Sequence, residues 1–221
     1  MKIPGGFDVI ASFYFRGRKE NKMSEKSKFN IKTIAKIAIL GALAVVLMLF
    51  DFPLPIAPSF YKLDFSEVPV LIGAFALGPW QAACIEFVKI VLNFLFNGTF
   101  TAGIGELANF LMGCAFVVPA GMIYQKDKTK SGAIKALVIG TLIMVIAGDL
   151  LNYFVLIPAY VNIVHYPLEA IIAAGQEKIP FVNSQLTLVL VCVTLFNLIK
   201  GILVSLITAL LYKSVSPILH R

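Results

Sequence analysis

Long apolar segments recur along almost the whole of this 221-residue chain. Hydrophobic side chains make up 59% of it and charged side chains only 14%, whereas an ordinary soluble domain is roughly half apolar and a quarter charged. A soluble protein of this size needs a charged outer surface, and disordered chains are poor in apolar residues. Because a helix crosses the hydrocarbon core with about 20 apolar residues, the sequence predicts an integral membrane protein.

Six segments are apolar enough to be expected as membrane-crossing helices. They cover about residues 31–50, 68–77, 80–96, 104–124, 133–157 and 186–212. The second is short for a span, and the Gly78-Pro79 pair after it predicts a tight turn. A short interfacial helix is expected around Leu168. We therefore predict an all-α polytopic membrane protein in which residues 31–213 form one domain of six transmembrane helices.

Basic residues cluster beside the apolar segments. Nine of the 19 Lys and Arg residues lie in the first 36 positions. Others follow in the connection after the fourth segment and at the end of the chain: Lys126, Lys128, Lys130, Lys135, Lys213 and Arg221. This distribution follows the positive-inside rule, so we expect cytoplasmic termini, with residues 1–30 as a flexible tail and 214–221 as a second tail. A patch for nucleic acid is disfavoured, and lipids are the expected surroundings.

Polar and ionisable side chains lie within the predicted spans, where they are costly and therefore functional candidates. They fall on four helical stripes, which are Glu86, Lys89 and Asn93; Glu106 and Asn109; Asp149, Asn152 and Tyr153; and Asn197 and Lys200. Stripes that face a common interior would form a polar pocket open to the outside. Simpler interpretations stay open: an internal ion pair for Glu86, a helix-terminal charge for Glu106 and a helix–helix hydrogen bond for Asp149.

The first expected outer loop is rich in aromatic residues and prolines. Its aromatic residues are Phe50, Phe52, Phe60, Tyr61 and Phe65, and three prolines within six residues exclude a helix there. The rings could pack on a flat heteroaromatic ligand or form an interfacial belt. In the first span, Ala38 and Ala42 are spaced so that another helix can approach closely. That helix could belong to a partner or to this chain.

Motifs for common catalytic chemistry are absent from the sequence. It contains no phosphate-binding glycine-rich loop, no nucleophile elbow and no His pair with metal-ligand spacing. Its three cysteines fall within apolar segments and suggest no disulfide framework. We assign no catalytic residue, metal or cofactor. A membrane-embedded enzyme that uses Glu86, Glu106 or Asp149 as acid or base is kept as an alternative.

Four blocks of sequence resemble the riboflavin-specific substrate-binding subunit, or S component, of energy-coupling factor (ECF) transporters. The blocks are Phe52–Pro79, Gly103–Phe110, Asn152–Pro158 and Phe196–Gly201, within a resemblance that covers about residues 29–213. The resemblance implies a non-enzymatic six-helix subunit of an ABC-type transporter in the cell membrane. Such a subunit binds riboflavin with high affinity from outside and works with a transmembrane coupling subunit and two ATPases. An S component for a different vitamin is the alternative on this scaffold.

The resemblance also implies roles for individual residues. Asn152, Asn197 and Lys200 would hydrogen-bond the flavin, and Ala38 and Ala42 resemble the motif that contacts the coupling subunit. The loop from Leu54 to Tyr61 would close over the ligand. Our predicted substrate site joins these loop and helix residues to their polar and aromatic neighbours: Leu54, Phe60, Tyr61, Glu106, Asp149, Asn152, Tyr153, Asn197 and Lys200.

Overall fold

The computed structural model describes residues 30–99 and 101–219. The tail predicted over residues 1–30 therefore lies outside the described residues, apart from Asn30. The chain divides into two compact units, Met1–Ala35 and Lys36–Arg221. In the first unit, the described residues from Ile31 onward form the start of helix α2 (Ile31–Met48). The rest of α2 and every later element belong to the second unit, which contains the candidate site.

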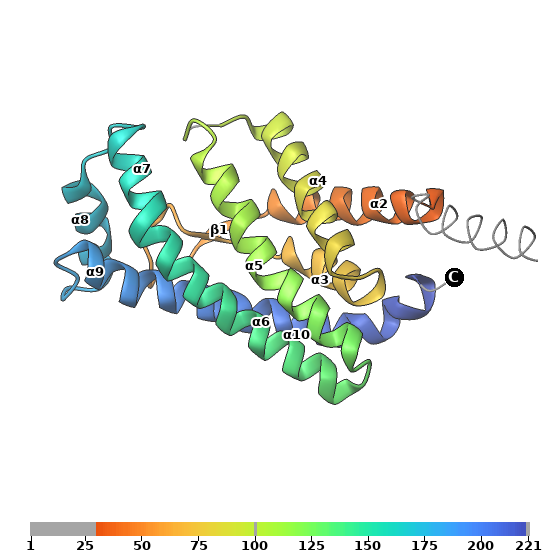
Figure 1. Ribbon diagram of the computed structural model, residues 1–221. Coiled ribbons are helices and arrows are strands. Elements are labelled where there is room, and N and C mark those ends of the chain that lie inside the picture. Colours follow the sequence, from red (N-terminus) through yellow and green to blue (C-terminus); the bar gives the residue numbers. More distant parts are fainter. Residues whose placement is uncertain (1–29, 100, 220–221) are drawn as a thin grey trace, which may run out of the picture. The chain divides into compact units, whose positions relative to one another are not determined.

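Helices make up nearly all of the second unit (Figure 1). After α2 they are α3 (Glu67–Ala76), α4 (Pro79–Asn97), α5 (Ile104–Lys126), α6 (Lys130–Leu151), α7 (Ile157–Asn162), α8 (Leu168–Lys178), α9 (Gln185–Thr187) and α10 (Thr194–Leu219). Two π-helical segments, η1 (Asn152–Leu156) and η2 (Leu188–Val193), join α6 to α7 and α9 to α10. The expected interfacial helix is α8, and α10 continues past residue 213 into the predicted C-terminal tail.

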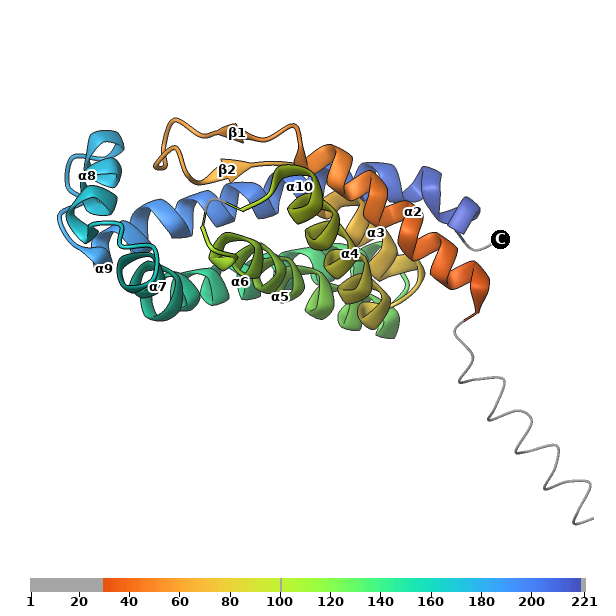
Figure 2. The ribbon, with the colours of Figure 1, turned by 90° about the horizontal axis from the view of Figure 1, so that it is seen from above.

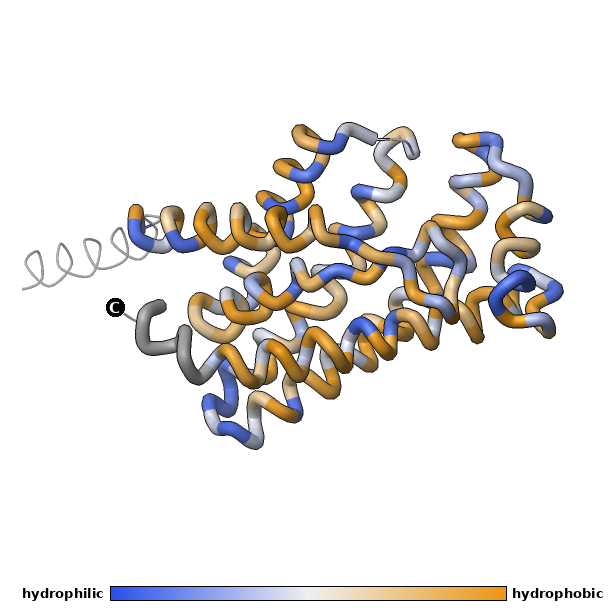
Figure 3. Tube along the Cα trace, turned by 180° about the vertical axis from the view of Figure 1, so that it is seen from behind, coloured by the Kyte–Doolittle hydropathy of each residue, from blue (hydrophilic) through white to orange (hydrophobic). Residues whose placement is uncertain are grey.

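Five helical stretches in the described part of the chain are long and apolar enough to cross a membrane. They are Ile31–Met48, Pro79–Asn97, Ile104–Lys126, Lys130–Asn162 and Gln185–Tyr212. Five of the six predicted segments are therefore confirmed as candidate spans. Figure 3 shows that apolar residues predominate along these helices, whereas hydrophilic residues gather at their connections. The chain is an all-α polytopic membrane protein.

The remaining predicted span, over residues 68–77, is the ten-residue helix α3. At 1.5 Å per residue it is about 15 Å long, roughly half the thickness of the hydrocarbon core. Nine of its ten residues are buried, because α4, α5 and α10 all pack against it. The segment is apolar on every side because protein surrounds it, so the count of six full-length spans is not reproduced.

Two short connections position α3 in the bundle. Before it, Phe52 pairs with Leu63 and Pro53 with Lys62 in an antiparallel hairpin of strands β1 (Phe52–Pro53) and β2 (Lys62–Leu63), visible in Figure 2. After it, Gly78 has a φ of 121°, which favours glycine. Pro79 then begins α4 at a position that needs no N–H donor. The predicted tight turn is confirmed.

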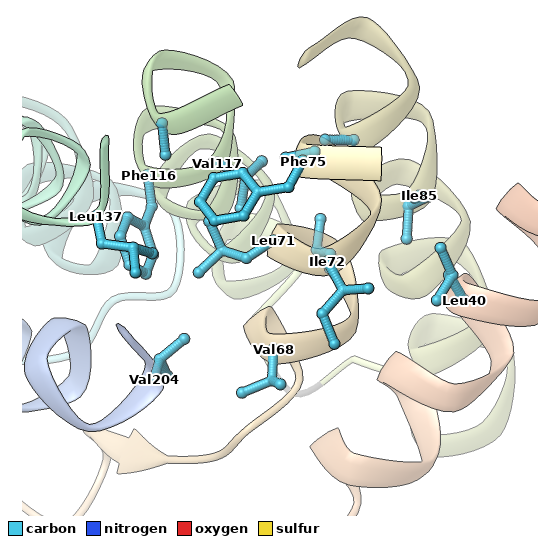
Figure 4. Packing of buried hydrophobic residues seen from close by; sticks show 14 of the residues in the cluster. Leu40, Val68, Leu71, Ile72, Phe75, Ile85, Phe116, Val117, Leu137 and Val204 are labelled. Carbon is cyan, nitrogen blue, oxygen red and sulfur yellow. The ribbon is translucent and has the colours of Figure 1, made fainter. Parts of the chain in front are cut away.

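The apolar core is centred on α3 (Figure 4). Leu71 and Phe75 of α3 pack with Phe116 of α5 and Val204 of α10, and all four are at most 1% exposed. On another side of α3, Ile85 of α4 approaches Gly73 so closely that a Cβ there would meet its side chain. Tight packing of this kind fixes the helices that carry the candidate site.

Candidate functional site

A cavity of about 510 Å³ lies between the β1–β2 loop and the helices α5, α6, α7 and α10. This volume falls in the range of roughly 300–1,000 Å³ that is typical of small-molecule sites. Aromatic and aliphatic side chains form much of the wall. Eight of its polar residues are buried or half-buried: Tyr61, Asp64, Glu67, Thr101, Asn152, Tyr160, Asn197 and Lys200.

Five of the nine residues in the predicted substrate site line this cavity. Phe60 and Tyr61 come from the loop, Asn152 from the start of η1, and Asn197 and Lys200 from α10. The structure therefore brings the aromatic loop together with polar residues of the fifth and sixth predicted segments. Asn109 of the fourth-segment stripe also lines the wall.

Two predicted carboxylates do not line the cavity. Glu106 lies in the first turn of α5 and accepts hydrogen bonds from the hydroxyl groups of Thr99 and Thr101 at 3.1 and 3.4 Å. Asp149 accepts a hydrogen bond of 2.9 Å from the hydroxyl group of Thr194, which joins α6 to α10. These are the helix-terminal charge and the helix–helix contact that the sequence left open.

The other two absent residues, Leu54 and Tyr153, pack into apolar clusters instead. Leu54 packs against the apolar cluster that contains Leu63 and so helps to hold the loop in place. Tyr153 follows Asn152 by one residue and therefore lies on a different side of η1, where it packs with the cluster around Leu188. Their positions explain how neighbours in sequence separate into cavity-facing and packing residues.

Lys200 is held in the cavity wall by Asp64. Its Nζ lies 3.0 Å from Asp64 Oδ2, while Asp64 Oδ1 accepts a hydrogen bond of 2.8 Å from the backbone N–H of Ser66. Burial opposes ionisation of Asp64, but Lys200, Lys89 and Ser66 outweigh it and lower the pKa of this carboxyl to about 2. Asp64 was not among the predicted site residues, although an acidic residue between an apolar loop and an apolar helix was a usable signal.

A second buried ion cluster lies beside this pair. The Nζ atom of Lys89, which is 1% exposed, lies 2.6 Å from Glu86 Oε1 and 2.7 Å from Glu67 Oε1. It donates a hydrogen bond to Glu67 and a longer one of 3.3 Å to Ser66 Oγ. The predicted Glu86–Lys89 ion pair is confirmed, and α3 adds Glu67, which sequence reasoning had not placed there. Only Glu67 of these three charged residues lines the cavity.

Tyr61 attaches the loop to the helices. Its hydroxyl group donates a hydrogen bond of 2.7 Å to Asn152 Oδ1, and its ring lies 5.5 Å from that of Phe196 between centroids. Asn152 Nδ2 in turn donates to the carbonyl oxygen of Gly148 at 2.8 Å. Burial raises the pKa of Tyr61, so the phenol stays protonated and remains a donor. Asn152 thus positions the loop as well as lining the cavity.

Asn197 is a buried wall residue whose side-chain amide is available to a ligand. It is 5% exposed and forms no side-chain hydrogen bond with the described residues. Its Nδ2 lies so close to Gly148 that a Cβ there would come within 2.5 Å. Glycine at this position therefore leaves space for the amide beside α6.

The alternative of a membrane-embedded enzyme requires acidic residues that share one site, and the three candidate carboxylates do not. Glu86 is enclosed beside Lys89, while Glu106 and Asp149 bind separate threonine hydroxyl groups. None of the three lines the cavity. Among residues 30–99 and 101–219, no group of three His, Cys, Asp or Glu side chains is placed to hold a metal ion.

Helix α2 has distinct inner and outer faces within the second unit. Ile37, Leu40 and Gly41 are buried, whereas Ala38 and Ala42 are exposed. Packing of the two alanines against another span of this chain, one of the interpretations left open by the sequence, is therefore not what the structure shows. Their face is available to lipid or to a partner helix.

Comparisons of this chain with a protein-family model and with known proteins agree with one another. Residues 32–212 match the family described as "ECF transporter, substrate-specific component". The riboflavin transporter RibU of Staphylococcus aureus is 35% identical over 202 residues, which cover 90% of this chain and 100% of that protein. The riboflavin transporter FmnP of Bacillus subtilis is 31% identical over 188 residues, covering 85% and 93%.

A solved structure agrees with this comparison. It is described as "Structure and mechanism of the S component of a bacterial ECF transporter" and superimposes with a TM-score of 0.66. Its sequence is 34% identical, and the match covers 86% of this chain and 98% of the other.

Proposed function

This chain belongs to the family of ECF transporter substrate-specific components, and we propose that it binds riboflavin for uptake into the cell. As a family member it is a multi-pass membrane protein and a transport subunit, and not an enzyme. The observation that carries the riboflavin assignment is the cavity of about 510 Å³, in which a loop of aromatic residues faces Asn197 and Lys200. Relatives named riboflavin transporters, 31–35% identical over most of the chain, support it.

The chemistry of the wall suits a flavin. The ring system is flat, with a polar pyrimidine edge and an apolar dimethylbenzene edge. The amide of Asn197 and the ammonium group of Lys200 can hydrogen-bond the polar edge, while Phe60 and Phe196 can pack on the rings. Three or four hydrogen bonds at about 1 kcal/mol each, with burial of the rings, favour tight binding. A ligand that left these buried groups unpaired would be rejected.

The arrangement in the membrane follows from charge. The basic N-terminal residues, the Lys-rich connection between α5 and α6, and the basic C-terminus favour the cytoplasmic side. Both ends of the chain lie inside only if the chain crosses the membrane an even number of times, so we propose that α3 and its flanking connections make a sixth crossing beside the five long spans. The β1–β2 loop and the cavity then face outward. Riboflavin would then enter from the external medium.

We also propose that α2 docks on a transmembrane coupling subunit, which two ATPases drive. Small exposed residues at i and i+4 allow helices to approach closely in a membrane, and Ala38 and Ala42 meet this condition. An Ala38→Trp variant is expected to bind riboflavin normally but to lose uptake in the complete complex. Ile39→Trp, at a 67% exposed neighbour on another side of α2, is the matched control. Normal uptake by Ala38→Trp would remove the docking assignment.

The experiment for the binding function is a spectrum of the purified protein. Flavin that copurifies gives the yellow absorbance band, and added riboflavin loses fluorescence when it is bound. Competition with other vitamins then separates riboflavin from the alternative ligands of the same scaffold. A colourless protein that leaves riboflavin fluorescence unchanged would contradict the proposal.

A further inference from the structure

Asp64 and Glu67 both contribute carboxylates to the cavity wall, but they differ in how many of their oxygens accept hydrogen bonds from the protein. Both oxygens of Asp64 have donors, since Oδ1 accepts from the N–H of Ser66 and Oδ2 from Lys200. Glu67 Oε1 accepts a hydrogen bond of 2.7 Å from Lys89. Glu67 Oε2 is buried and accepts no hydrogen bond from the described residues. Both carboxylate oxygens of Asp64 therefore have hydrogen-bond donors without a ligand, whereas Glu67 Oε2 has none.

An unpaired oxygen on a buried carboxylate is costly, because the group has lost water without gaining a donor. The side chain of Glu67 is only 5% exposed, yet the residue forms part of the cavity wall. Since Lys89 engages Oε1, the free acceptor is Oε2. A molecule in the cavity is therefore the available source of the missing donor.

Glu86 provides an internal comparison. Its oxygens also accept no hydrogen bond of good geometry, although Oε1 lies 2.6 Å from Lys89 Nζ. Glu86 is fully buried and does not line the cavity, so no ligand there would reach it. Lys89 donates its hydrogen bond to Glu67 Oε1, and Glu67 is the carboxylate of this cluster that lines the cavity.

We propose that Glu67 is a ligand-binding residue whose Oε2 accepts a hydrogen bond from an N–H or O–H group of the bound vitamin. The identity of the vitamin rests on the proposed function. Riboflavin carries both kinds of donor, the imide N–H of its ring and the hydroxyl groups of its ribityl chain. Hydrogen bonds to a charged acceptor are stronger than those between neutral groups, so Glu67 favours ligands with a donor at this position.

The test is the Glu67→Gln variant in a riboflavin fluorescence-quenching titration. The Gln carbonyl oxygen can keep the contact with Lys89, which leaves the amide N–H₂ where Oε2 was. A donor then faces the donor of the ligand, and affinity for riboflavin is expected to fall about 10- to 100-fold. Glu86→Gln makes the same chemical change beside the same lysine and is expected to bind riboflavin within about twofold of wild type.

Two analogues identify the contact in the ligand. N3-methylriboflavin lacks the imide N–H, and lumiflavin lacks the ribityl hydroxyl groups. The difference between wild type and Glu67→Gln is expected to disappear for one of them, because that analogue has lost the donor. Because the affinities for different ligands are compared on the same variant, a general loss of protein stability would not produce a difference between the ligands. If Glu67→Gln does not fold, Glu67→Asp, which keeps the charge but withdraws it by one methylene, takes its place.

Three results would overturn the inference. They are an unchanged affinity of Glu67→Gln for riboflavin, an equal loss for all three ligands, and an equal loss in Glu86→Gln. The last two would assign the effect to the ion cluster and not to ligand contact. Wild-type protein that binds no flavin would instead refute the proposed function and the inference together, so the two failures are distinguishable.

Discussion

The apolar core around α3 and the cavity beside it bury their side chains for opposite purposes. In the core, Phe75, Phe116 and Leu137 are 0–4% exposed and belong to one apolar cluster. At the cavity, buried Asn197 and Glu67 have side-chain atoms that form no hydrogen bond within residues 30–99 and 101–219. The first region gives the bundle its rigidity, and the second holds polar groups ready for a ligand.

Helix geometry differs between the two regions as well. The described residues of the core lie in α-helices, whereas both π-helical segments, η1 and η2, occur toward the end of the bundle that holds the cavity. Asn152, which opens η1, lines the cavity. Single π-helical turns are frequent at functional sites, and here one accompanies the residue that joins the loop to the helices.

Phe116→Ala should produce the largest effect on folding and so test the core side of the comparison. Removing a fully buried ring leaves a void, and we expect a loss of about 3 kcal/mol in the free energy of unfolding. Thermal unfolding in detergent measures it. Phe87→Ala, at a position that is 60% exposed, is the control and should change the melting temperature little. Equal stability of the two variants would contradict the assigned core.

Lys200→Ala should produce the largest effect on binding among the cavity substitutions. It removes a predicted flavin contact and leaves Asp64 buried without its partner 3.0 Å away. We expect about a 100-fold weaker riboflavin affinity with expression retained, measured by fluorescence quenching. An affinity within a few-fold of wild type would show that Lys200 serves structure alone.

Asn152→Ala should produce a smaller effect, because much of this amide is used within the protein. We expect about a tenfold loss of affinity, corresponding to one neutral hydrogen bond. Tyr61→Phe removes only the 2.7 Å bond between the loop and Asn152. Comparison of the two dissociation rates separates ligand contact from anchoring of the loop. Identical losses in both variants would assign Asn152 to anchoring.

The smallest effect is expected from pH. Because the pKa of Asp64 is lowered to about 2, its ion pair with Lys200 is fully present above pH 4 and is lost only as the pH falls through 2. Riboflavin affinity should therefore change by less than about twofold between pH 5 and 8 in wild type, as followed by quenching titrations. A steep loss between pH 6 and 5 would contradict a permanently ionised Asp64.

Sequence patterns predicted the long helices and several polar wall residues well. Apolar length determines whether a segment can span, so five spans were found, and helical spacing placed Asn197 and Lys200 on one face of α10. The same reasoning overestimated α3, since burial in protein and burial in lipid select the same apolar residues. Length was the one signal that distinguished them.

Contacts between distant segments could not be predicted. Asp64 and Lys200 are 136 residues apart, and nothing in either local pattern indicates their pairing. Glu106 and Asp149 satisfied the stripe pattern equally well, but threonine hydroxyl groups bind them and neither carboxylate lines the cavity. Local periodicity assigns a face to a residue, whereas the tertiary arrangement decides what that face meets.

The enclosed position of α3 also constrains how the protein is made. A helix of ten residues is too short to span the bilayer by itself, and one of its packing partners, α10, is the most C-terminal helix of the described residues and is synthesised after α3. Its native position is therefore reached only after translation of residues 194–219. Assembly of the cavity, whose wall includes Glu67 at the start of α3, consequently follows the synthesis of α10.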